Sequence, residues 1–527
     1  MCNFLLRSAA RRSWLVYALV CLFAVGPYSV LADAPNSPVS RLILRLHDDP
    51  LAHAASGPVQ TTEERLNSIL QSLHIEGVVL DRSVDASLVV MRFTLPVSEQ
   101  QIAEIAHRLE SSPEVMYAEP DAWVKRAYTP SDPLVERTRQ WFHYDTYGIR
   151  AYEAWDLERG DAGVVIALLD TGILPHEDLD PARVLAGYDF ISVNAISNDS
   201  NGRDPDPTDP GDAVAANECG AGEPAEDSSW HGLHLAGIMT ATADNTVGGT
   251  GINHVSRLLP VRVLGKCGGN FSDILDAILW SAGLPVSGVP TNTTPAKVIN
   301  LSFAGTGVCN AAVQDAIDRA VAAGSIVVAA AGNGNGTDIA NVFPAGCNNV
   351  VAVAATDRSG AVASYSNVGS RVLLSAPGGD GVFTNGIYST HNTGLTSAGA
   401  DSYTYFTGTS VASAQVSAAV SLILSLKPTL TLSDVRQILS QTAQPYTGGC
   451  LAGNCGAGRL DMFAALQLAQ TTTPSNPPAA VQVSGGGGGG GGGCILQPGA
   501  ASRFDGAWGI LALFLGGLWL RHQSMRG

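Results

Sequence analysis

Short apolar runs alternate with longer amphipathic segments between residues 164 and 426, and this alternation restricts the fold more than any other feature. An uninterrupted apolar run is typical of a strand buried on both faces, and strands that alternate with helices form parallel sheets. The expected strands are residues 164–169, 259–264, 298–301, 326–330 and 350–353. The expected helices are residues 272–282, 311–323 and 411–426. The pattern predicts an α/β domain with a mainly parallel sheet flanked by helices.

The first expected strand ends in Asp170-Thr171-Gly172. Ligand-binding and catalytic groups of open α/β sheets gather at the carboxyl ends of the strands. Asp170 is therefore a candidate functional residue, although an aspartate that only caps a turn fits the same sequence.

A second candidate, His231, begins the sequence His-Gly-Leu-His, which is followed by small residues that suit a packed helix. Two histidines three residues apart could also bind a metal ion. No glutamate lies between His231 and His234, so the pattern of zinc proteases is absent.

Ser410 stands in Gly408-Thr409-Ser410, directly before the expected helix 411–426. Backbone N–H groups in the first turn of a helix are unpaired, and the helix dipole favours negative charge there. That position suits the formation of an oxyanion, whereas a lone serine at a helix start is more often an N-cap.

Asp170, His231 and Ser410 occur in the order found in the subtilisin-like serine peptidases, which the chain resembles from about Asp132 to Leu468. The resemblance implies that Ser410 is the nucleophile, that His231 is its base and that Asp170 orients the imidazole. It also implies that Asn333, which follows an expected strand in Ala-Gly-Asn, donates to the oxyanion. A catalytically inactive scaffold of the same fold, serving in surface binding or adhesion, is the alternative class of function.

The resemblance further implies two substrate-binding segments. One segment pairs with the substrate backbone and contains Ser302, Phe303, Ala304 and Gly305. The facing wall contains Ala330, Ala331 and Gly332. Neither segment contains a carboxylate, and small apolar walls leave room for a large side chain. We therefore expect a broad endopeptidase that prefers Phe, Tyr, Leu or Met at P1, acting on protein or peptide substrates.

The first part of the chain predicts an exported precursor. Residues 1–32 combine arginines with a short apolar stretch, as in a secretory signal peptide. Residues 40–125 have the pattern β-α-β-β-α-β of a small α+β, ferredoxin-like unit. This unit resembles the inhibitory propeptide of subtilisin-like enzymes, which would make it an intramolecular inhibitor of the catalytic domain at 130–470. A small domain retained in the mature protein is the alternative.

The composition changes again at the other end of the chain. Residues 471–493 form a Thr- and Pro-rich linker and a glycine tract, and residues 494–527 contain an apolar stretch with a basic end. This arrangement resembles the C-terminal sorting signals of Gram-negative bacteria and implies transient membrane contact. A retained anchor or a terminal core helix is the alternative. The sequence does not decide the role of Cys494.

Six cysteines fall within the expected catalytic domain, an even number that suits a secreted protein with disulfides. Their connectivity stays open at this level. The pairing we favour is Cys219–Cys267, Cys309–Cys347 and Cys450–Cys455.

The formal net charge of −17 argues against nucleic-acid binding and suits an exported bacterial protein, secreted or held at the cell surface. We expect a monomer that needs no cofactor for catalysis. One loop concentrates the carboxylates of Asp199, Asp204, Asp206, Asp209 and Asp212. This loop is either a structural Ca²⁺ site or a solvated acidic insertion. His176 and His254 lie near turns and are expected to be structural.

Overall fold

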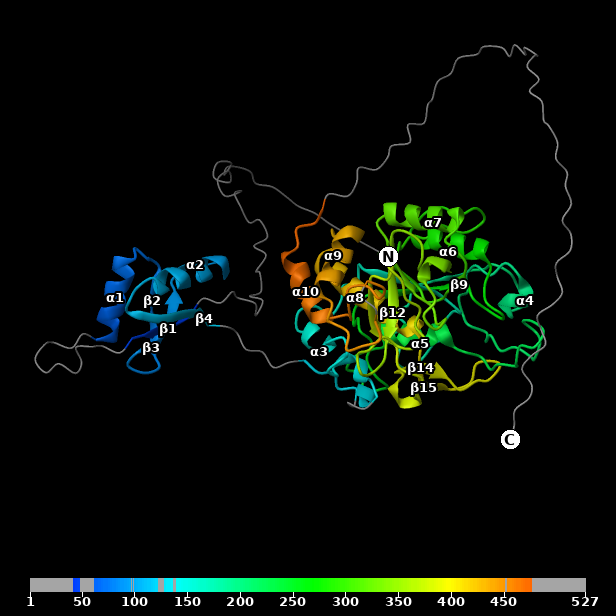
Figure 1. Cartoon of the computed structure of the whole chain (residues 1–527), viewed down its shortest axis with the longest axis horizontal. Helices are drawn as coiled ribbons and strands as arrows, with labels where there is room; N and C mark the ends of the chain where they lie inside the picture. Colours follow the sequence, from blue (N-terminus) through cyan, green and yellow to red (C-terminus); the bar gives the residue numbers. More distant parts are fainter. Residues whose placement is uncertain are drawn as a thin grey trace, which may run out of the picture.

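The computed structural model describes residues 41–47, 61–95, 97, 99–121, 128–135, 139–450 and 453–475. They form a small α+β unit and a large α/β unit, each with hydrophobic core residues of its own (Figure 1). The expected signal peptide, the expected sorting tail and residues 476–493 of the expected linker lie outside the described residues.

The small unit has the β-α-β-β-α-β order expected from its sequence. Its elements are β1 (Arg41–Leu46), α1 (Thr62–Ser72), β2 (Val78–Ser83), β3 (Leu88–Phe93), α2 (Glu99–Glu110) and β4 (Val115–Pro120). The sheet is antiparallel with the strand order β2-β3-β1-β4. Helix α1 begins at a capping box, in which Thr61 Oγ1 accepts from the Glu64 backbone N–H at 3.2 Å. Alternate residues of β1 pack with α1 and α2 in one core.

The large unit is built on a seven-stranded sheet with the order β13-β12-β10-β8-β5-β7-β6. Its strands are β5 (Val165–Asp170), β6 (Tyr188–Asp189), β7 (Arg257–Arg262), β8 (Val298–Leu301), β10 (Ile326–Ala330), β12 (Val350–Thr356) and β13 (Leu374–Pro377). All neighbouring strands run parallel. The five strands expected from the sequence are all present, so the predicted α/β class is confirmed.

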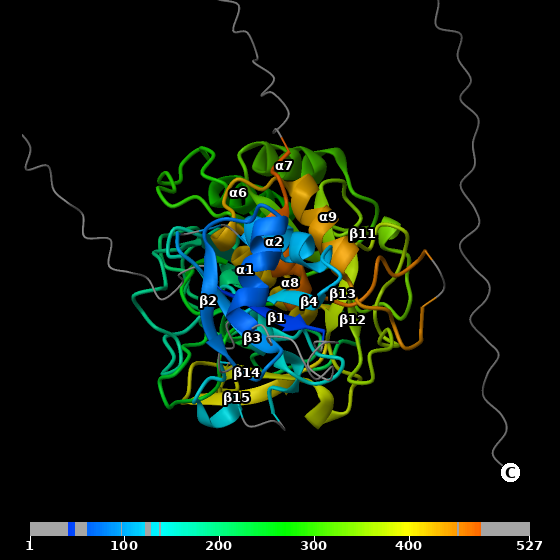
Figure 2. The ribbon, with the colours of Figure 1, turned by 90° about the vertical axis from the view of Figure 1, so that its left-hand side faces the viewer.

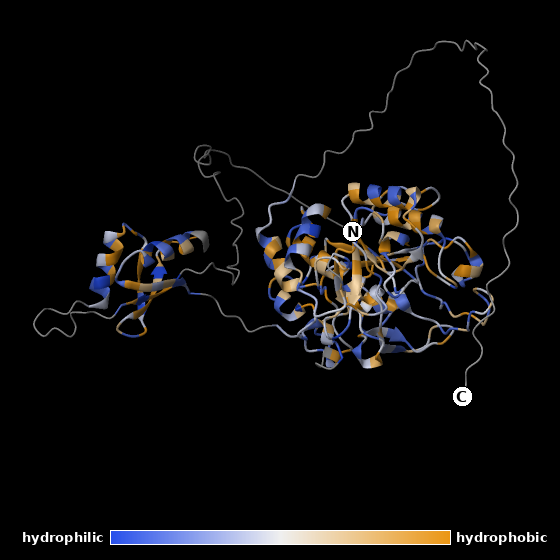
Figure 3. Ribbon diagram, viewed as in Figure 1, coloured by the Kyte–Doolittle hydropathy of each residue, from blue (hydrophilic) through white to orange (hydrophobic). Residues whose placement is uncertain are grey.

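Helices cover both faces of this sheet. One face carries α5 (His231–Thr240), α8 (Thr409–Leu426), α9 (Leu432–Thr442) and α10 (Met462–Thr471). The other face carries α6 (Phe271–Ser281) and α7 (Ala311–Ala322), which lie side by side in Figure 1. Successive residues of β5 enter opposite cores: Ile166 and Leu168 pack with α8, whereas Ala167 and Leu169 pack with α6 and α7. Hydrophobic residues accordingly concentrate on the central strands in Figure 3.

Helix α8 is the central helix of the unit, because it packs against β8, β10, β12 and β13. Within the described part of the chain it is the one helix long and apolar enough to cross a membrane. Most of its residues are buried against the sheet and neighbouring helices, so it is a core helix.

The remaining elements are short and mostly lie at the edges. They are α3 (Ala151–Ala154), α4 (Asn194–Ser197), β9 (Gly305–Thr306), β11 (Val342–Phe343), β14 (Ile387–Asn392), β15 (Asp401–Phe406), and the 3₁₀ helices η1 (Pro133–Val135), η2 (Trp141–His143), η3 (Ile339–Asn341) and η4 (Phe383–Asn385). The β14–β15 hairpin lies at the lower edge of the large unit in Figure 2. Strand β14 packs on α5 so closely that a Cβ on Gly237 would lie 2.2 Å from Thr390 Oγ1.

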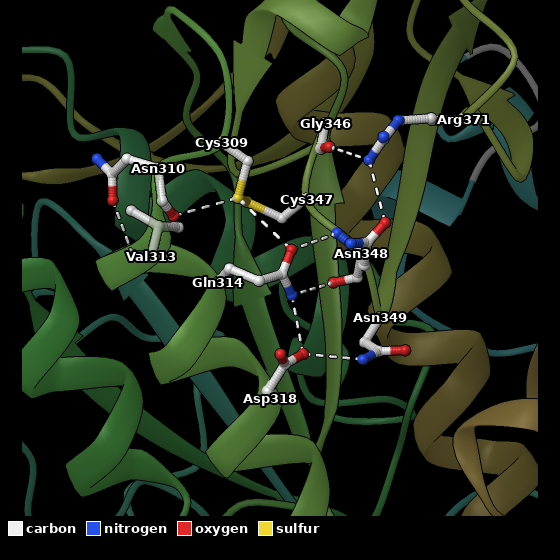
Figure 4. Close-up of a disulfide and its surroundings, with 10 residues drawn as sticks. All are labelled: Cys309, Asn310, Val313, Gln314, Asp318, Gly346, Cys347, Asn348, Asn349 and Arg371. Carbon is white, nitrogen blue, oxygen red and sulfur yellow. Dashed lines mark hydrogen bonds between the residues drawn. A yellow bond between two sulfur atoms is a disulfide. The ribbon is translucent and has the colours of Figure 1, made fainter.

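Three disulfides join Cys219 to Cys267, Cys309 to Cys347 and Cys450 to Cys455. The favoured pairing is therefore confirmed. Figure 4 shows the second disulfide beside α7, where the side chain of Gln314 accepts from the Asn348 backbone N–H at 2.8 Å.

Candidate active site

The carboxylate of Asp170 and the ring of His231 form the central contact of the site. Asp170 is the last residue of β5 and is fully buried. Its Oδ1 atom lies 2.8 Å from His231 Nδ1 and also accepts from the Thr171 backbone N–H at 2.8 Å. A carboxylate accepts hydrogen bonds, so it favours the tautomer with the proton on Nδ1. The Nε2 atom of neutral His231 is then free to accept a proton.

The start of α5 fixes the histidine next to the end of β5. The Gly232 backbone N–H donates to Thr171 Oγ1 at 3.0 Å. A Cβ on Gly232 would lie 2.1 Å from the Gly172 carbonyl oxygen, so only glycine allows this approach. The His231 backbone N–H donates to Ser229 Oγ at 3.3 Å, which extends the contacts to the preceding loop.

Charges around His231 favour its protonated form. Burial lowers the pKa of His231, but the negative charge of Asp170 and the hydrogen bond to it raise the pKa above the usual 6.5 overall. Asp212 and Asp209 act in the same direction. An imidazolium formed during catalysis would therefore be stabilised.

His234, the second histidine of the motif, has a structural environment. Its ring stacks on Phe406 with a centroid distance of 4.0 Å, and its Nε2 atom lies 3.2 Å from the Thr404 carbonyl oxygen. Burial lowers its pKa to about 3, so it stays neutral. No group of three or more His, Cys, Asp or Glu that could hold a metal ion occurs in the described ranges.

Ser410 lies in the first turn of α8 and is half-buried. Its hydroxyl donates to the Ser302 carbonyl oxygen at 2.8 Å. A hydroxyl has one proton, so Ser410 does not donate to His231 in this arrangement. Transfer of the proton to His231 requires the hydroxyl to turn away from Ser302.

A buried polar network holds the backbone of Ser410. Ser302 Oγ and Ser413 Oγ lie 3.0 and 2.9 Å from the Ser410 carbonyl oxygen. Asn300 then links the strand to the helix, because it donates to Ser302 Oγ at 2.8 Å and accepts from Ser417 Oγ at 2.8 Å. The network fixes the start of α8 relative to the end of β8.

Sequence reasoning missed Asn300, Ser413 and Ser417. The signal was present, because Ser413 and Ser417 lie on one face of a helix of mainly small and apolar residues at a spacing of four residues. Asn300 is likewise the polar exception within a buried strand. Buried polar groups need partners, so these residues were candidates for contact with each other.

Asn333 contacts Thr409, the residue before Ser410. Its Oδ1 atom accepts from the Thr409 backbone N–H and from Thr409 Oγ1, both at 2.9 Å. Thr409 Oγ1 in turn accepts from the Gly332 backbone N–H at 3.0 Å. Among the described residues the Nδ2 atom of Asn333 has no acceptor, and a Cβ on Gly408 would lie 3.2 Å from it. An amide donor therefore lies free next to the start of α8.

The two expected substrate-binding segments lie close together. A Cβ on Gly332 would lie 3.0 Å from the Cβ of Ala304, which is exposed. Ser302 is buried and holds Ser410, whereas Phe303 and Gly305 are half-buried. In the facing wall, Ala330 and Ala331 are both buried, and Ala331 packs in the core on the α6–α7 side of the sheet.

The expected acidic loop has its carboxylates dispersed. Asp199 accepts from the buried Arg262 at 3.0 Å, and Asp209 accepts from Thr171 Oγ1 at 2.7 Å. The side chain of Asp212 accepts from Ser229. The remaining two carboxylates stabilise turns of the loop. Asp204 Oδ1 and Asp206 Oδ1 accept from the backbone N–H groups of residues 206 and 208. The arrangement of these carboxylates therefore does not support the expected Ca²⁺ site.

His176 and His254 both make structural contacts. His176 Nε2 lies 3.1 Å from the Ser402 carbonyl oxygen. The ring of His254 packs on Trp155 at a centroid distance of 4.6 Å, and burial lowers its pKa to about 3.

Residues 161–458, more than half of the chain, match the Subtilase family. The chain belongs to the subtilase family. This subtilase is 46% identical over 367 residues to a protein named Extracellular protease from Xanthomonas campestris pv. campestris, across 69% of the chain and 61% of that relative. It is 40% identical over 366 residues to the Extracellular basic protease of Dichelobacter nodosus, across 68% of the chain and 59% of that relative. The matches thus span less than two thirds of these relatives' own length.

Two further matches cover the whole of the other protein. Thermitase from Thermoactinomyces vulgaris is 33% identical over 343 residues, which is 64% of the subtilase and 100% of thermitase. A solved structure of a protease from Pseudoalteromonas arctica PAMC 21717 is 46% identical and superposes with a TM-score of 0.62, across 65% of the subtilase and 100% of that chain.

Proposed function

We propose that this subtilase is a secreted serine endopeptidase that hydrolyses peptide bonds through an acyl-enzyme. The observation that carries the proposal is the 2.8 Å contact between Asp170 Oδ1 and His231 Nδ1. The free amide of Asn333 beside the start of α8 supports it further. The names of the relatives, Extracellular protease and thermitase among them, agree with this class of activity.

In the proposed mechanism, Ser410 Oγ attacks the carbonyl carbon of the scissile bond while His231 Nε2 takes the hydroxyl proton. Asp170 stabilises the imidazolium that results. The oxyanion accepts hydrogen bonds from Asn333 Nδ2 and from the Ser410 backbone N–H. His231 then donates its proton to the leaving amine, and water hydrolyses the acyl ester by the same route in reverse. Each oxyanion donor contributes about 3–4 kcal/mol of transition-state stabilisation.

The same proposal includes a preference for large apolar side chains at P1. The proposed P1 pocket lies between the segments 302–305 and 330–332, which contain no carboxylate. Ala304 is small and exposed, which supports access of a substrate side chain to this position. Kinetics on peptides that differ only at P1 test this part, and fastest cleavage after lysine would contradict it.

We further propose that the chain is made as an auto-inhibited precursor. The small unit at 40–125 would be the intramolecular inhibitor, residues 1–32 the signal peptide, and residues 494–527 a sorting tail with transient membrane contact. Residues 471–493 would be the linker, and the mature enzyme would be a monomer in the medium or at the surface of a Gram-negative bacterium. A structural Ca²⁺ ion remains part of the proposal, and a thermal midpoint unchanged by chelator would contradict it.

Labelling with a fluorophosphonate tests the proposed activity directly, because the reagent needs an activated serine. We expect the wild-type protein to be labelled and to cleave peptides, whereas Ser410→Ala abolishes both, with a loss of about six orders of magnitude in turnover. A cooperative thermal unfolding transition should show that the variant is folded. Cleavage undiminished in Ser410→Ala, or absence of labelling in the wild type, would leave the inactive scaffold as the better assignment.

The same variant tests the precursor. If maturation is autocatalytic, Ser410→Ala accumulates with the small unit attached, and the wild type appears without it. Mass spectrometry of the intact proteins distinguishes the two. A wild-type protein that keeps residues 40–125 while fully active would contradict the inhibitory role.

A further inference from the structure

A cavity of about 360 Å³ opens beside His231. His231 and Thr171 form one wall, the turn at 265–268 forms a second, and the loop at 212–229 forms the third. Thr171 directly follows Asp170, so the cavity borders the proposed catalytic residues. The proposed mechanism and the proposed P1 pocket do not involve this cavity.

The cavity is acidic. Asp212 and Glu226 line it, whereas no lysine or arginine of the described residues does. Asp212 accepts one hydrogen bond on each oxygen from Ser229, at 2.6 and 2.7 Å, and a carboxylate can accept more. Glu226 is exposed, and its carboxylate makes no hydrogen bond or ion pair within the described ranges. A neighbouring cation does not neutralise these charges, since Lys266 is paired with Glu218 at 2.8 Å.

The wall that carries Glu226 is held in place by covalent and backbone contacts. The disulfide between Cys219 and Cys267 joins the loop to the turn, and both cysteines line the cavity. Val214 and Glu226 pair through two backbone hydrogen bonds of 2.9 and 3.0 Å. The Glu226 side chain therefore starts from a fixed backbone position, which a selective contact requires.

The position of the cavity indicates which part of a substrate reaches it. Strand β5, which ends in Asp170, lies between β7 and β8 in the sheet. The turn at 265–268 follows β7, and the segment 302–305 follows β8, so the two flank the site. Adjacent side chains of an extended peptide point to opposite sides. With P1 in the proposed pocket, the side chain before it would point to the opposite face, and the cavity, which no residue of 302–305 or 330–332 lines, lies on the side of His231.

We propose that this cavity is a subsite for a lysine or arginine side chain at P2, an inference that rests on the proposed peptidase function. The charged end of the substrate side chain pairs with Glu226 and Asp212. Leu264 and Val214, which also line the cavity, contact its methylene groups. The subtilase is then selective for a cationic residue followed by a large apolar one.

The test compares peptides that have Lys or Ala at P2 and are otherwise identical. We expect wild-type kcat/KM to favour Lys, and Glu226→Gln to reduce the Lys-to-Ala ratio about three- to fivefold, the effect of one exposed ion pair. The matched control is Glu223→Gln, because Glu223 is exposed in the same loop and does not line the cavity. It should leave the ratio unchanged. Glu226→Lys should invert the preference toward Glu at P2.

The outcomes separate this inference from the proposed function. A wild type that is labelled by fluorophosphonate but does not prefer Lys at P2 overturns the subsite alone. So does a ratio that Glu226→Gln and Glu226→Lys leave unchanged, or a preference found at P1′ in place of P2. A wild type that is neither labelled nor active overturns the proposed function itself.

Discussion

Thr409 directs two hydrogen bonds at one oxygen of Asn333, from its backbone N–H and from its hydroxyl, each 2.9 Å long. The amide of Asn333 thus has a defined orientation, because a flip would place its N–H group against two donors. The Nδ2 atom is left beside Gly408, next to the start of α8. Thr409, which precedes the proposed nucleophile Ser410, therefore orients the amide donor of the proposed oxyanion hole.

This relationship predicts separate effects for three substitutions. Asn333→Ala removes the donor and should lower kcat by about 10²–10³ with little change in KM. Thr409→Val removes only the hydroxyl and should lower kcat by about tenfold, the value of one hydrogen bond. Thr409→Ser keeps the hydroxyl and should restore most of the rate. Steady-state kinetics on one peptide measure all three, and equal rates for Thr409→Val and Thr409→Ser would contradict the orienting role.

The pH dependence of kcat/KM should report the environment of His231. In the proposed mechanism, His231 acts as a base only when it is unprotonated. Burial lowers its pKa, but the charge of Asp170 and the hydrogen bond to it raise the pKa above 6.5 overall. Activity should therefore rise with pH with a midpoint above 6.5. Asp212→Asn removes one of the charges that raise this pKa, so it should move the midpoint to lower pH.

The control for this shift is Asp206→Asn, which changes an exposed carboxylate of the same loop. Asp170, Asp212 and Asp209 are the charges that raise the pKa of His231 most, so Asp206 should affect it less. A midpoint that moves equally in both variants would show that the general charge of the loop, not the position of Asp212, determines the shift.

Gly232→Ala should damage the site although alanine favours a helix. The new Cβ would lie 2.1 Å from the Gly172 carbonyl oxygen, which belongs to the backbone and has little room to move. The start of α5 must then separate from β5, which lengthens the contact between His231 and Asp170. We expect a loss of about 1–3 kcal/mol of stability, as for other overpacked sites, and a kcat reduced far more than KM is changed.

Gly220→Ala is a matched control, because the nearest atom to its Cβ would be Glu223 Cγ at 3.5 Å. Thermal unfolding and peptide kinetics should both match the wild type. If Gly232→Ala behaves like this control, the close approach of α5 to β5 is not required for activity.

Two disulfides should contribute unequally to stability. Cys309–Cys347 spans 38 residues and Cys450–Cys455 spans 5. The chain-entropy model gives about 4 kcal/mol for the longer loop and about 2 kcal/mol for the shorter one. Asn348 N–H donates to Gln314, and Arg371 donates to the Gly346 carbonyl oxygen, so the local fold should remain when the longer disulfide is removed (Figure 4). Chemical denaturation of the two double Cys→Ser variants checks the order, which equal losses would contradict.

Five strands of the large sheet and the helices α6, α7 and α8 were predicted, because the strands are buried apolar runs and the helices carry buried apolar residues. Helices α9 and α10 were not predicted. Residues 326–330 form β10 with the expected bounds, since an apolar run between polar turns has few alternatives. The β14–β15 hairpin was not predicted. Its Thr, Tyr and Ser residues pack on α5 or lie half-buried at an edge, so the sequence shows no clear alternation there.

By itself, the sequence determined the α/β class, the family resemblance and the identity of four candidate residues, because motifs and apolar periodicity are local along the chain. Only the tertiary structure decided how those residues meet. It placed Asp170 against His231, oriented the Asn333 amide through hydrogen bonds from Thr409, and directed the Ser410 hydroxyl to the Ser302 carbonyl oxygen. It also closed an acidic cavity between the turn at 265–268 and a distant loop. Such contacts join residues far apart in sequence, and their geometry depends on the packing of the whole sheet.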